Sequence, residues 1–157
     1  MRERTLEREQ FIPVPIEVVC ARFADVENLE AITPSWLQFK ILSAIPVDMR
    51  SGLVIEHRLR LHGVPIRWRT LIDPWNPPHG FTDTQIWGPF ATWVHTHSFM
   101  PVAGGTLARD HVRYRIGYGP IGDLALHLFV QRDIERIFDF RRDAIHHLLT
   151  NRLGSTP

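Results

Sequence analysis

From Trp36 onward, apolar and polar residues alternate in a series of short segments, and this period of two constrains the fold more than any other feature of the sequence. Such alternation is typical of strands that have one buried face and one solvated face. Turns rich in Gly, Pro and Ser separate the segments, as in antiparallel sheets. With a first strand at Thr5–Ile12, the pattern predicts seven strands; the other six are Leu37–Ala44, Val54–Leu61, Ile66–Asp73, Gly80–Trp87, Thr92–Pro101 and Leu107–Tyr118.

Helical spacing is found outside these segments. Pro15 suits the first turn of a helix that runs to Ala24, because proline needs no amide partner there. A second short helix is expected over Asp25–Thr33, where Pro34 ends it. A long helix is expected from Gly122 to about Arg152, with one apolar stripe along its length.

The predicted order is therefore one strand, two short helices, six strands and a long C-terminal helix. Helices on one side of an antiparallel sheet define an α+β protein. The length of 157 residues favours a single domain over 1–157.

Composition excludes several classes of protein. The net charge is +1, so no general excess of positive charge points to nucleic acid, and no recognition motif does either. Cys20 is the only cysteine, which excludes an intrachain disulfide and favours a reducing compartment. No apolar run approaches the roughly 20 residues that span a bilayer. We therefore expect a cytoplasmic protein without integral membrane association.

Seven short motifs stand out along the chain: Phe23-Ala-Asp-Val-Glu-Asn-Leu, Ile32-Thr-Pro-Ser-Trp36, Trp75-Asn-Pro-Pro, Phe81-Thr-Asp-Thr-Gln85, Gly88-Pro-Phe, Trp93-Val-His-Thr-His97 and Ile137-Phe-Asp-Phe-Arg141. With the predicted order of elements, they resemble the SRPBCC superfamily, which includes the START lipid-transfer domains, the birch-pollen allergens and the polyketide cyclases. The similarity extends over essentially the whole chain and is nearest to bacterial ligand-binding-like members. The resemblance implies a helix-grip fold, in which a curved seven-stranded sheet wraps the long helix and leaves a cavity between them.

Alternation also predicts which side chains face this interior. A β-bulge in Gly80–Trp87 would turn part of that strand over. The expected apolar wall consists of Trp68, Phe81, Trp87, Trp93, Phe99 and Tyr114. The expected polar groups are His57, Asp83, Gln85, His95, His97, Asp110 and Arg141.

Burying so many ionisable groups costs several kcal/mol each unless they find partners. They can satisfy one another, with Arg141 paired to Asp83 or Asp110, or they can bind the polar end of a ligand. These two interpretations are compatible. We expect a protein that binds a small hydrophobic or amphipathic molecule, lipid-like or polyketide-like, through the interior residues named above other than Asp110.

Two alternatives use chemistry at the same residues. His95 or His97 with Asp83 or Asp110 could act as a general acid or base, as in a cyclase, dehydratase or hydrolase. His95 and His97, with His57 or one of the aspartates, could also hold zinc. That motif is short and common by chance, so structural histidines are favoured, and no metal or other cofactor is expected.

The opposite faces of the strands are rich in arginine. A solvated face is the favoured interpretation, and the alternative is an interaction module that contacts an anionic surface weakly through Arg58, Arg60, Arg67 and Arg69. The remaining outward arginines are Arg109, Arg113 and Arg115.

Overall fold

The computed structural model describes residues 3–117 and 119–151, and its strands form one seven-stranded antiparallel sheet in the order β1-β7-β6-β5-β4-β3-β2. The strands are β1 (Arg4–Ile12), β2 (Lys40–Ile41), β3 (Leu53–Leu61), β4 (Val64–Asn76), β5 (Gly80–Trp87), β6 (Phe90–Val102) and β7 (Gly105–Ile116). The helical segments are α1 (Ile16–Ala24), η1 (Val26–Leu29), η2 (Ser35–Leu37), α2 (Gly119–Ala125), η3 (Leu126–Val130) and α3 (Gln131–Thr150).

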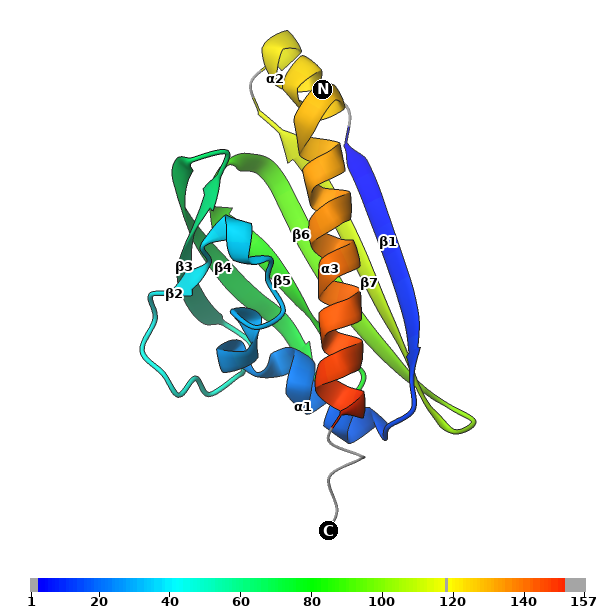
Figure 1. Ribbon diagram of the computed structural model, residues 1–157. Coiled ribbons are helices and arrows are strands. Elements are labelled where there is room, and N and C mark those ends of the chain that lie inside the picture. Colours follow the sequence, from blue (N-terminus) through cyan, green and yellow to red (C-terminus); the bar gives the residue numbers. More distant parts are fainter. Residues whose placement is uncertain (1–2, 118, 152–157) are drawn as a thin grey trace.

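The sheet curves around α3, which runs along its inner side (Figure 1). The helix α1 covers the sheet beside the C-terminal end of α3, while α2 extends beyond the opposite end (Figure 1). In η2, the ring of Trp36 lies against Arg136 in the first half of α3. This arrangement confirms the α+β helix-grip fold that the sequence predicts.

Two groups of buried apolar side chains hold α3 on the sheet. One joins α1 to the end of α3 and includes Phe23, Phe99 and Ile145. The other joins the beginning of α3 to β1 and β7 and includes Tyr114 and Phe138. Each large apolar side chain contributes about 1.5–3 kcal/mol when it is fully buried, so these two groups fix the position of the helix.

The predicted strand Leu37–Ala44 is wrong in extent, because only Lys40–Ile41 pairs with β3. Gln38 adopts a left-handed conformation at the end of η2, with φ of 46°. Farther along, the amides of Leu42 and Ser43 both donate to the carbonyl of Glu56. This double contact is an irregularity of the bulge type, and no regular pairing with β3 continues beyond Ile41.

The helices also differ from prediction in detail. The segment expected over Asp25–Thr33 forms the 3-10 helix η1, where the Asp25 carboxylate accepts bonds from the Glu27 amide and the Asn28 side chain, each at 3.0 Å. The long helix begins earlier than predicted, at Gly119, and contains the π-helical segment η3. The predicted ends Tyr118 and Arg152 lie outside the described residues.

The hairpin between β3 and β4 reaches across to α3. Its turn residues His62 and Gly63 have φ of 50° and 80°. His62 Nε2 lies 2.7 Å from Oδ2 of Asp133, a buried carboxylate near the start of α3. This contact ties the hairpin to the helix that the sheet surrounds.

Gly80 is the first residue of β5 and lies beside His97 of β6, so its substitution tests the pairing of these two strands. Its φ is 149°, and a Cβ there would collide with the main-chain carbonyl of His97. Gly63 also has a positive φ, but a Cβ there meets nothing within 4 Å. We therefore expect Gly80→Ala to lose about 1–3 kcal/mol more unfolding free energy than Gly63→Ala, measured by urea denaturation. Equal losses would contradict the close approach of the two strands.

Candidate functional site

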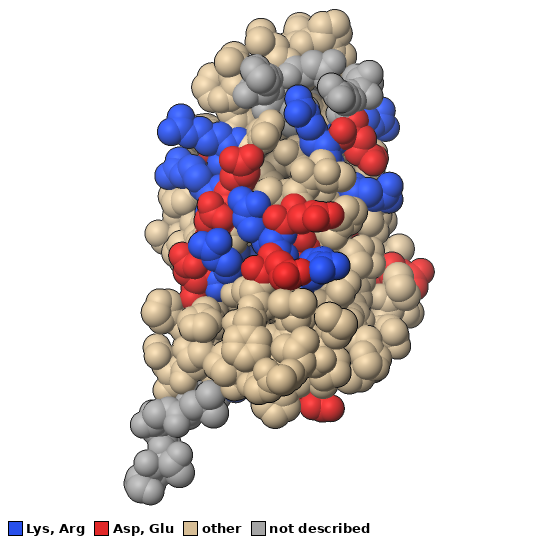
Figure 2. All heavy atoms as spheres, turned by 90° about the vertical axis from the view of Figure 1, so that its right-hand side faces the viewer, with Lys and Arg blue, Asp and Glu red and all other residues tan. Residues whose placement is uncertain are grey.

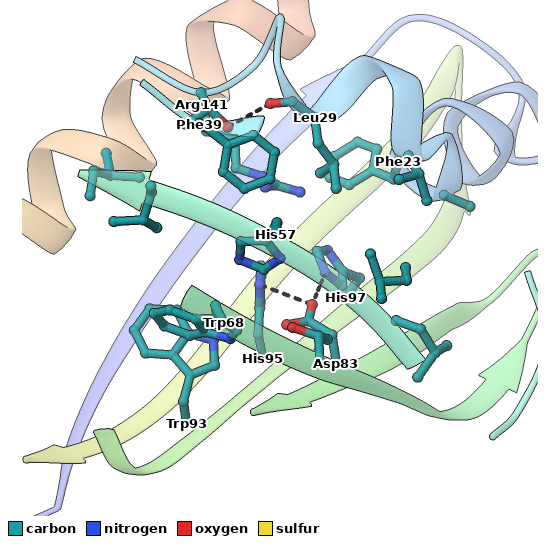
Figure 3. A pocket seen from close by; sticks show the side chains of 18 of the residues that line it. Phe23, Leu29, Phe39, His57, Trp68, Asp83, Trp93, His95, His97 and Arg141 are labelled. Carbon is teal, nitrogen blue, oxygen red and sulfur yellow. Dashed lines mark hydrogen bonds and ion pairs between the residues drawn. The ribbon is translucent and has the colours of Figure 1, made fainter. Parts of the chain in front are cut away.

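A cavity of about 190 Å³ lies between the sheet and the helices. Strands β3, β4, β5 and β6 form one wall, and α1, η1, η2 and α3 supply the rest. Its lining is largely apolar, with aromatic side chains from both walls. Figure 3 shows Phe23, Phe39, Trp68 and Trp93 among the side chains around it.

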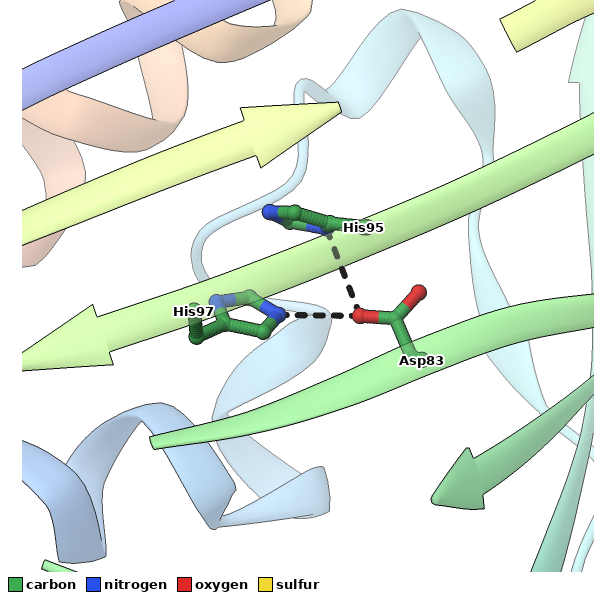
Figure 4. A group of neighbouring side chains, drawn as sticks. All are labelled: Asp83, His95 and His97. Carbon is green, nitrogen blue, oxygen red and sulfur yellow. Dashed lines mark hydrogen bonds and ion pairs between the residues drawn. The ribbon is translucent and has the colours of Figure 1, made fainter. Parts of the chain in front are cut away.

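Polar side chains gather on the strand side of this cavity. Alternation along β6 places His95 and His97 on the same face, and both are buried. Asp83 of β5 lies opposite His95 in the ladder, and Asp110 of β7 lies opposite His97. Pairing of three neighbouring strands thus brings two imidazoles and two carboxylates together, and Figure 4 shows Asp83 facing both histidines.

The four side chains form a closed set of short contacts. His95 Nε2 lies 2.8 Å from Asp110 Oδ1, and His97 Nε2 lies 2.9 Å from Asp83 Oδ2. The second ring nitrogens are also near carboxylates: His95 Nδ1 is 3.3 Å from Asp83 Oδ2, and His97 Nδ1 is 3.0 Å from Asp110 Oδ1. The last contact is close but not aligned as a hydrogen bond.

Burial and mutual charge set the protonation of this group. Burial favours neutral carboxyl groups, but the two histidines outweigh it and lower the pKa of Asp83 and of Asp110. Burial and the neighbouring His97 lower the pKa of His95. Burial also opposes a charge on His97, but Asp110 and Asp83 outweigh it and raise its pKa. Both aspartates are therefore ionised at neutral pH.

His57 and Arg141 complete the polar lining. The His57 ring stacks on Trp68, with centroids 5.8 Å apart, and lies 4.8 Å from the Phe39 ring. Its Nδ1 and the Nε of Arg141 are buried without a hydrogen-bond partner among the described residues. The alternative in which Arg141 pairs with Asp83 or Asp110 is wrong for this structure, because within the described residues both carboxylates pair with histidines instead.

The structure brings most of the predicted interior residues to the cavity, but not all of them. His57, Trp68, Phe81, Asp83, Trp93, His95, His97 and Arg141 line it. Phe99 and Tyr114 are buried in the two apolar groups that hold α3, but they do not line the cavity. Asp110 of β7 contacts His95 and His97 but does not line the cavity.

Gln85 and Trp87 correct the predicted facing of β5. Arg69 pairs with Trp87 but Thr70 pairs with Gln85, so Ile86 is an unmatched residue in a bulge. The bulge reverses the direction in which the side chains beyond it face, so Trp87 points outward and is 56% exposed. Gln85 instead binds the main chain of Phe90, donating to its carbonyl at 2.7 Å and accepting from its amide at 3.2 Å.

Sequence reasoning missed part of the opposite wall. Phe23 lines the cavity and was recognisable as an apolar residue on the inner face of the first helix. Leu29, Phe39 and Met49 also line it. They lie in a 3-10 turn and in irregular chain, where no periodicity indicates a facing direction.

The arginine-rich outer face divides into two regions. Over β1 and β7, basic and acidic side chains interleave (Figure 2), and Arg109 and Arg113 pair with Glu9 and Glu3. Such exposed pairs contribute about 0–1 kcal/mol. Over β3 and β4, the exposed Arg58 lies directly opposite the exposed Arg67 in the ladder.

Residues 12–140 match the family described as polyketide cyclase / dehydrase and lipid transport. This span is more than half of the chain, so the chain belongs to that family. The membership confirms the resemblance to the SRPBCC superfamily.

Solved structures show the same fold at low sequence identity. The Zhui aromatase/cyclase from Streptomyces sp. R1128 is 15% identical, with 98% of each chain covered and a TM-score of 0.78. The protein TTHA0849 from Thermus thermophilus is 19% identical, with 98% of this chain and 100% of that chain covered and a TM-score of 0.73. A START superfamily protein from Mycobacterium smegmatis is 14% identical, with coverage of 94% and 97% and a TM-score of 0.65.

The curated proteins include no match to this sequence. Within the described residues, no helix combines the length and the apolar character needed to cross a bilayer.

The burial of His57 predicts a pH dependence of stability. Burial lowers its pKa from 6.5 to about 4, although Asp83 opposes this shift. Between pH 6.5 and pH 4, His57 is protonated in the unfolded chain but not in the folded one. The free energy of unfolding therefore decreases as the pH falls from 6.5 towards 4. The loss from this residue is at most about 3 kcal/mol. We expect His57→Phe to flatten this part of the profile in urea denaturation, and an unchanged slope would contradict the burial of His57.

Proposed function

We propose that the chain binds a small amphipathic molecule, lipid-like or polyketide-like, in the cavity beneath α3. The cavity itself carries this proposal, because it combines aromatic walls with polar groups on one side. An apolar cavity of roughly 150 Å³ accommodates benzene. A volume of about 190 Å³ therefore suits a one- or two-ring aromatic compound or a short acyl chain.

The family supports this choice of ligand class. Its description joins polyketide cyclases with lipid transport, and both activities handle largely apolar molecules that carry oxygen atoms. The proteins of similar structure also include an aromatase/cyclase and a START superfamily protein.

The unpartnered polar atoms indicate what the ligand carries at its polar end. Arg141 Nε is a buried donor without a partner in the described residues, and such a donor costs about 1–3 kcal/mol. A carboxylate, sulfonate or phenolate oxygen would satisfy it with a charge-assisted hydrogen bond. His57 Nδ1 offers a second contact nearby in the lining. The ligand is therefore proposed to present an anionic oxygen towards Arg141.

Acid–base catalysis is the second candidate function, favoured by the His–Asp contacts beside the cavity. A ring nitrogen and a carboxylate oxygen lie 2.8–2.9 Å apart in both pairs. However, every ring nitrogen of His95 and His97 lies within 3.3 Å of a carboxylate. None is left for a substrate proton in this arrangement, which favours binding over catalysis. Release of a chemically altered ligand after incubation would reverse this preference.

Filling the cavity tests the binding proposal. Leu59 lies in the lining, whereas Val64 at the start of β4 is 60% exposed. We expect Leu59→Trp to weaken binding of the two-ring fluorescent probe naphthalene-1-sulfonate by at least about tenfold, since the indole occupies the ligand's volume. Val64→Trp should bind like the wild type.

A second filling variant guards against a folding defect in the first. Ile137→Trp fills the same cavity from α3. Circular dichroism and urea denaturation identify the folded variants. Wild-type affinity in a folded Leu59→Trp or Ile137→Trp protein would contradict binding in this cavity.

Two adjacent arginines on α3 provide a matched test of the polar end. Arg141 lines the cavity, whereas Arg142 is exposed and pairs with Asp139 and Asp143. We expect Arg141→Met to weaken binding of the sulfonate probe by about tenfold or more and to leave the uncharged two-ring probe naphthalene unaffected. Arg142→Met should change neither affinity. Equal effects of the two substitutions would argue against an anion-binding role for Arg141.

A further inference from the structure

Three donor atoms converge beside the cavity. His97 Nε2 lies 2.9 Å from Asp83 Oδ2, and His95 Nδ1 lies 3.3 Å from the same oxygen. These three side chains offer ligand atoms that all lie within 4.8 Å of one another. Figure 4 shows the two rings approaching Asp83 from the neighbouring strand.

Proton counting makes this convergence unfavourable for neutral histidines. A neutral imidazole has one N–H group and one lone pair. In a neutral His95 the N–H group is at Nε2, where it donates to Oδ1 of Asp110 at 2.8 Å. Its Nδ1 lone pair then faces the anionic oxygen of Asp83, which is repulsive. A cation among the three atoms would turn this repulsion into two attractive contacts.

The charges around the cluster point the same way. Two carboxyl groups, those of Asp83 and Asp110, contact the histidines, and the guanidinium of Arg141 lies in the lining. With both carboxyl groups ionised and both imidazoles neutral, one negative charge is uncompensated in a site that excludes most water, whereas a proton on His97 would neutralise it. A divalent cation would compensate it and leave a net positive charge facing the cavity.

We propose that Asp83, His95 and His97 bind a divalent transition-metal ion, for which zinc is the best fit, at the polar side of the cavity. Two nitrogens and one oxygen are a typical donor set of catalytic zinc sites, which keep a fourth position open. Asp110 accepts from the outer nitrogen of His95, the contact that usually orients a metal-binding histidine. The open position faces the cavity and takes an oxygen atom of water or of an anionic ligand.

The spacing of the donors is close to what such a site needs. Zinc bonds of about 2.0–2.2 Å in a tetrahedron place donor atoms roughly 3.3–3.6 Å apart. The distances of 2.9 Å and 3.3 Å to Asp83 Oδ2 reach this range with shifts of a few tenths of an ångström. The Asp83 carboxylate, the most exposed of the three side chains at 20%, is the group that we expect to move.

Metal titration of the full chain tests the site without any assay of activity. After treatment with a chelator and its removal, the wild type is titrated with Co²⁺, whose visible absorption reports its ligands, and then with Zn²⁺ as competitor. We expect one Co²⁺ per chain, displacement by Zn²⁺, and a higher Tm with the metal bound. A folded wild type that gives no ligand-field absorption and no rise in Tm at millimolar Co²⁺ would overturn the proposal.

Variants assign the binding to these side chains. His95→Gln, His97→Gln and Asp83→Asn should each weaken Co²⁺ binding at least about 100-fold, and Asp110→Asn by about 10–100-fold. The control is His111→Gln, because His111 lies on β7 outside the cavity, 3.7 Å from Glu7. Circular dichroism shows which variants fold, and any folded member of the first three decides the result. Wild-type affinity in such a variant would overturn the assignment.

A protonated His97 is the competing explanation of the short contacts. In that case both of its nitrogens carry protons, which ¹⁵N NMR of the histidine side chains detects. A doubly protonated His97 that is unchanged by saturating Zn²⁺ would overturn the metal site. Loss of its proton on the Nε2 side upon addition of Zn²⁺ would support it.

Discussion

The ladder register on both sides of β6 is the constraint on which the interior of this protein depends. Asp83 lies opposite His95 because β5 pairs with β6 in one register, and Asp110 lies opposite His97 because of the register with β7. A slip of one residue in either pairing would move the carboxylates to the outer face. The buried imidazoles would then lose their partners at a cost of several kcal/mol. The polar cluster and the strand pairing therefore stabilise each other.

Packing of α3 explains why a cavity can exist beside this cluster. The helix is held at both ends, by Ile145 in one apolar group and by Phe138 in the other. From Ile134 to Arg141, α3 lines a cavity that β3 to β6 close from the sheet side and that side chains only partly fill. The His62–Asp133 contact adds a tie from the β3–β4 hairpin. The free energy that secures the fold thus comes from regions that surround the cavity, and the space itself is available for a ligand.

The sequence predicted those parts of the molecule that follow a regular period. Alternation identified the strands and placed His57, His95 and His97 inside, and aromatic neighbours placed Trp68 and Trp93 with them. It failed where geometry departs from the period. The bulge at Ile86 turned Trp87 outward, and the left-handed Gln38 shortened the predicted second strand. A bulge or a left-handed residue depends on which carbonyl each backbone amide bonds to. The hydropathy pattern of the sequence does not contain that information.

The two walls of the cavity differ in how freely they can change. The sheet wall is fixed by continuous ladders and carries the ionisable side chains, so almost any substitution there disturbs several partners at once. The facing wall consists partly of Leu29, Phe39 and Met49, from a short turn and irregular chain. Evolution can exchange those three for larger or smaller apolar residues without altering the imidazoles and carboxylates opposite. The shape of the ligand and the chemistry applied to it can therefore diverge independently in descendants of this chain.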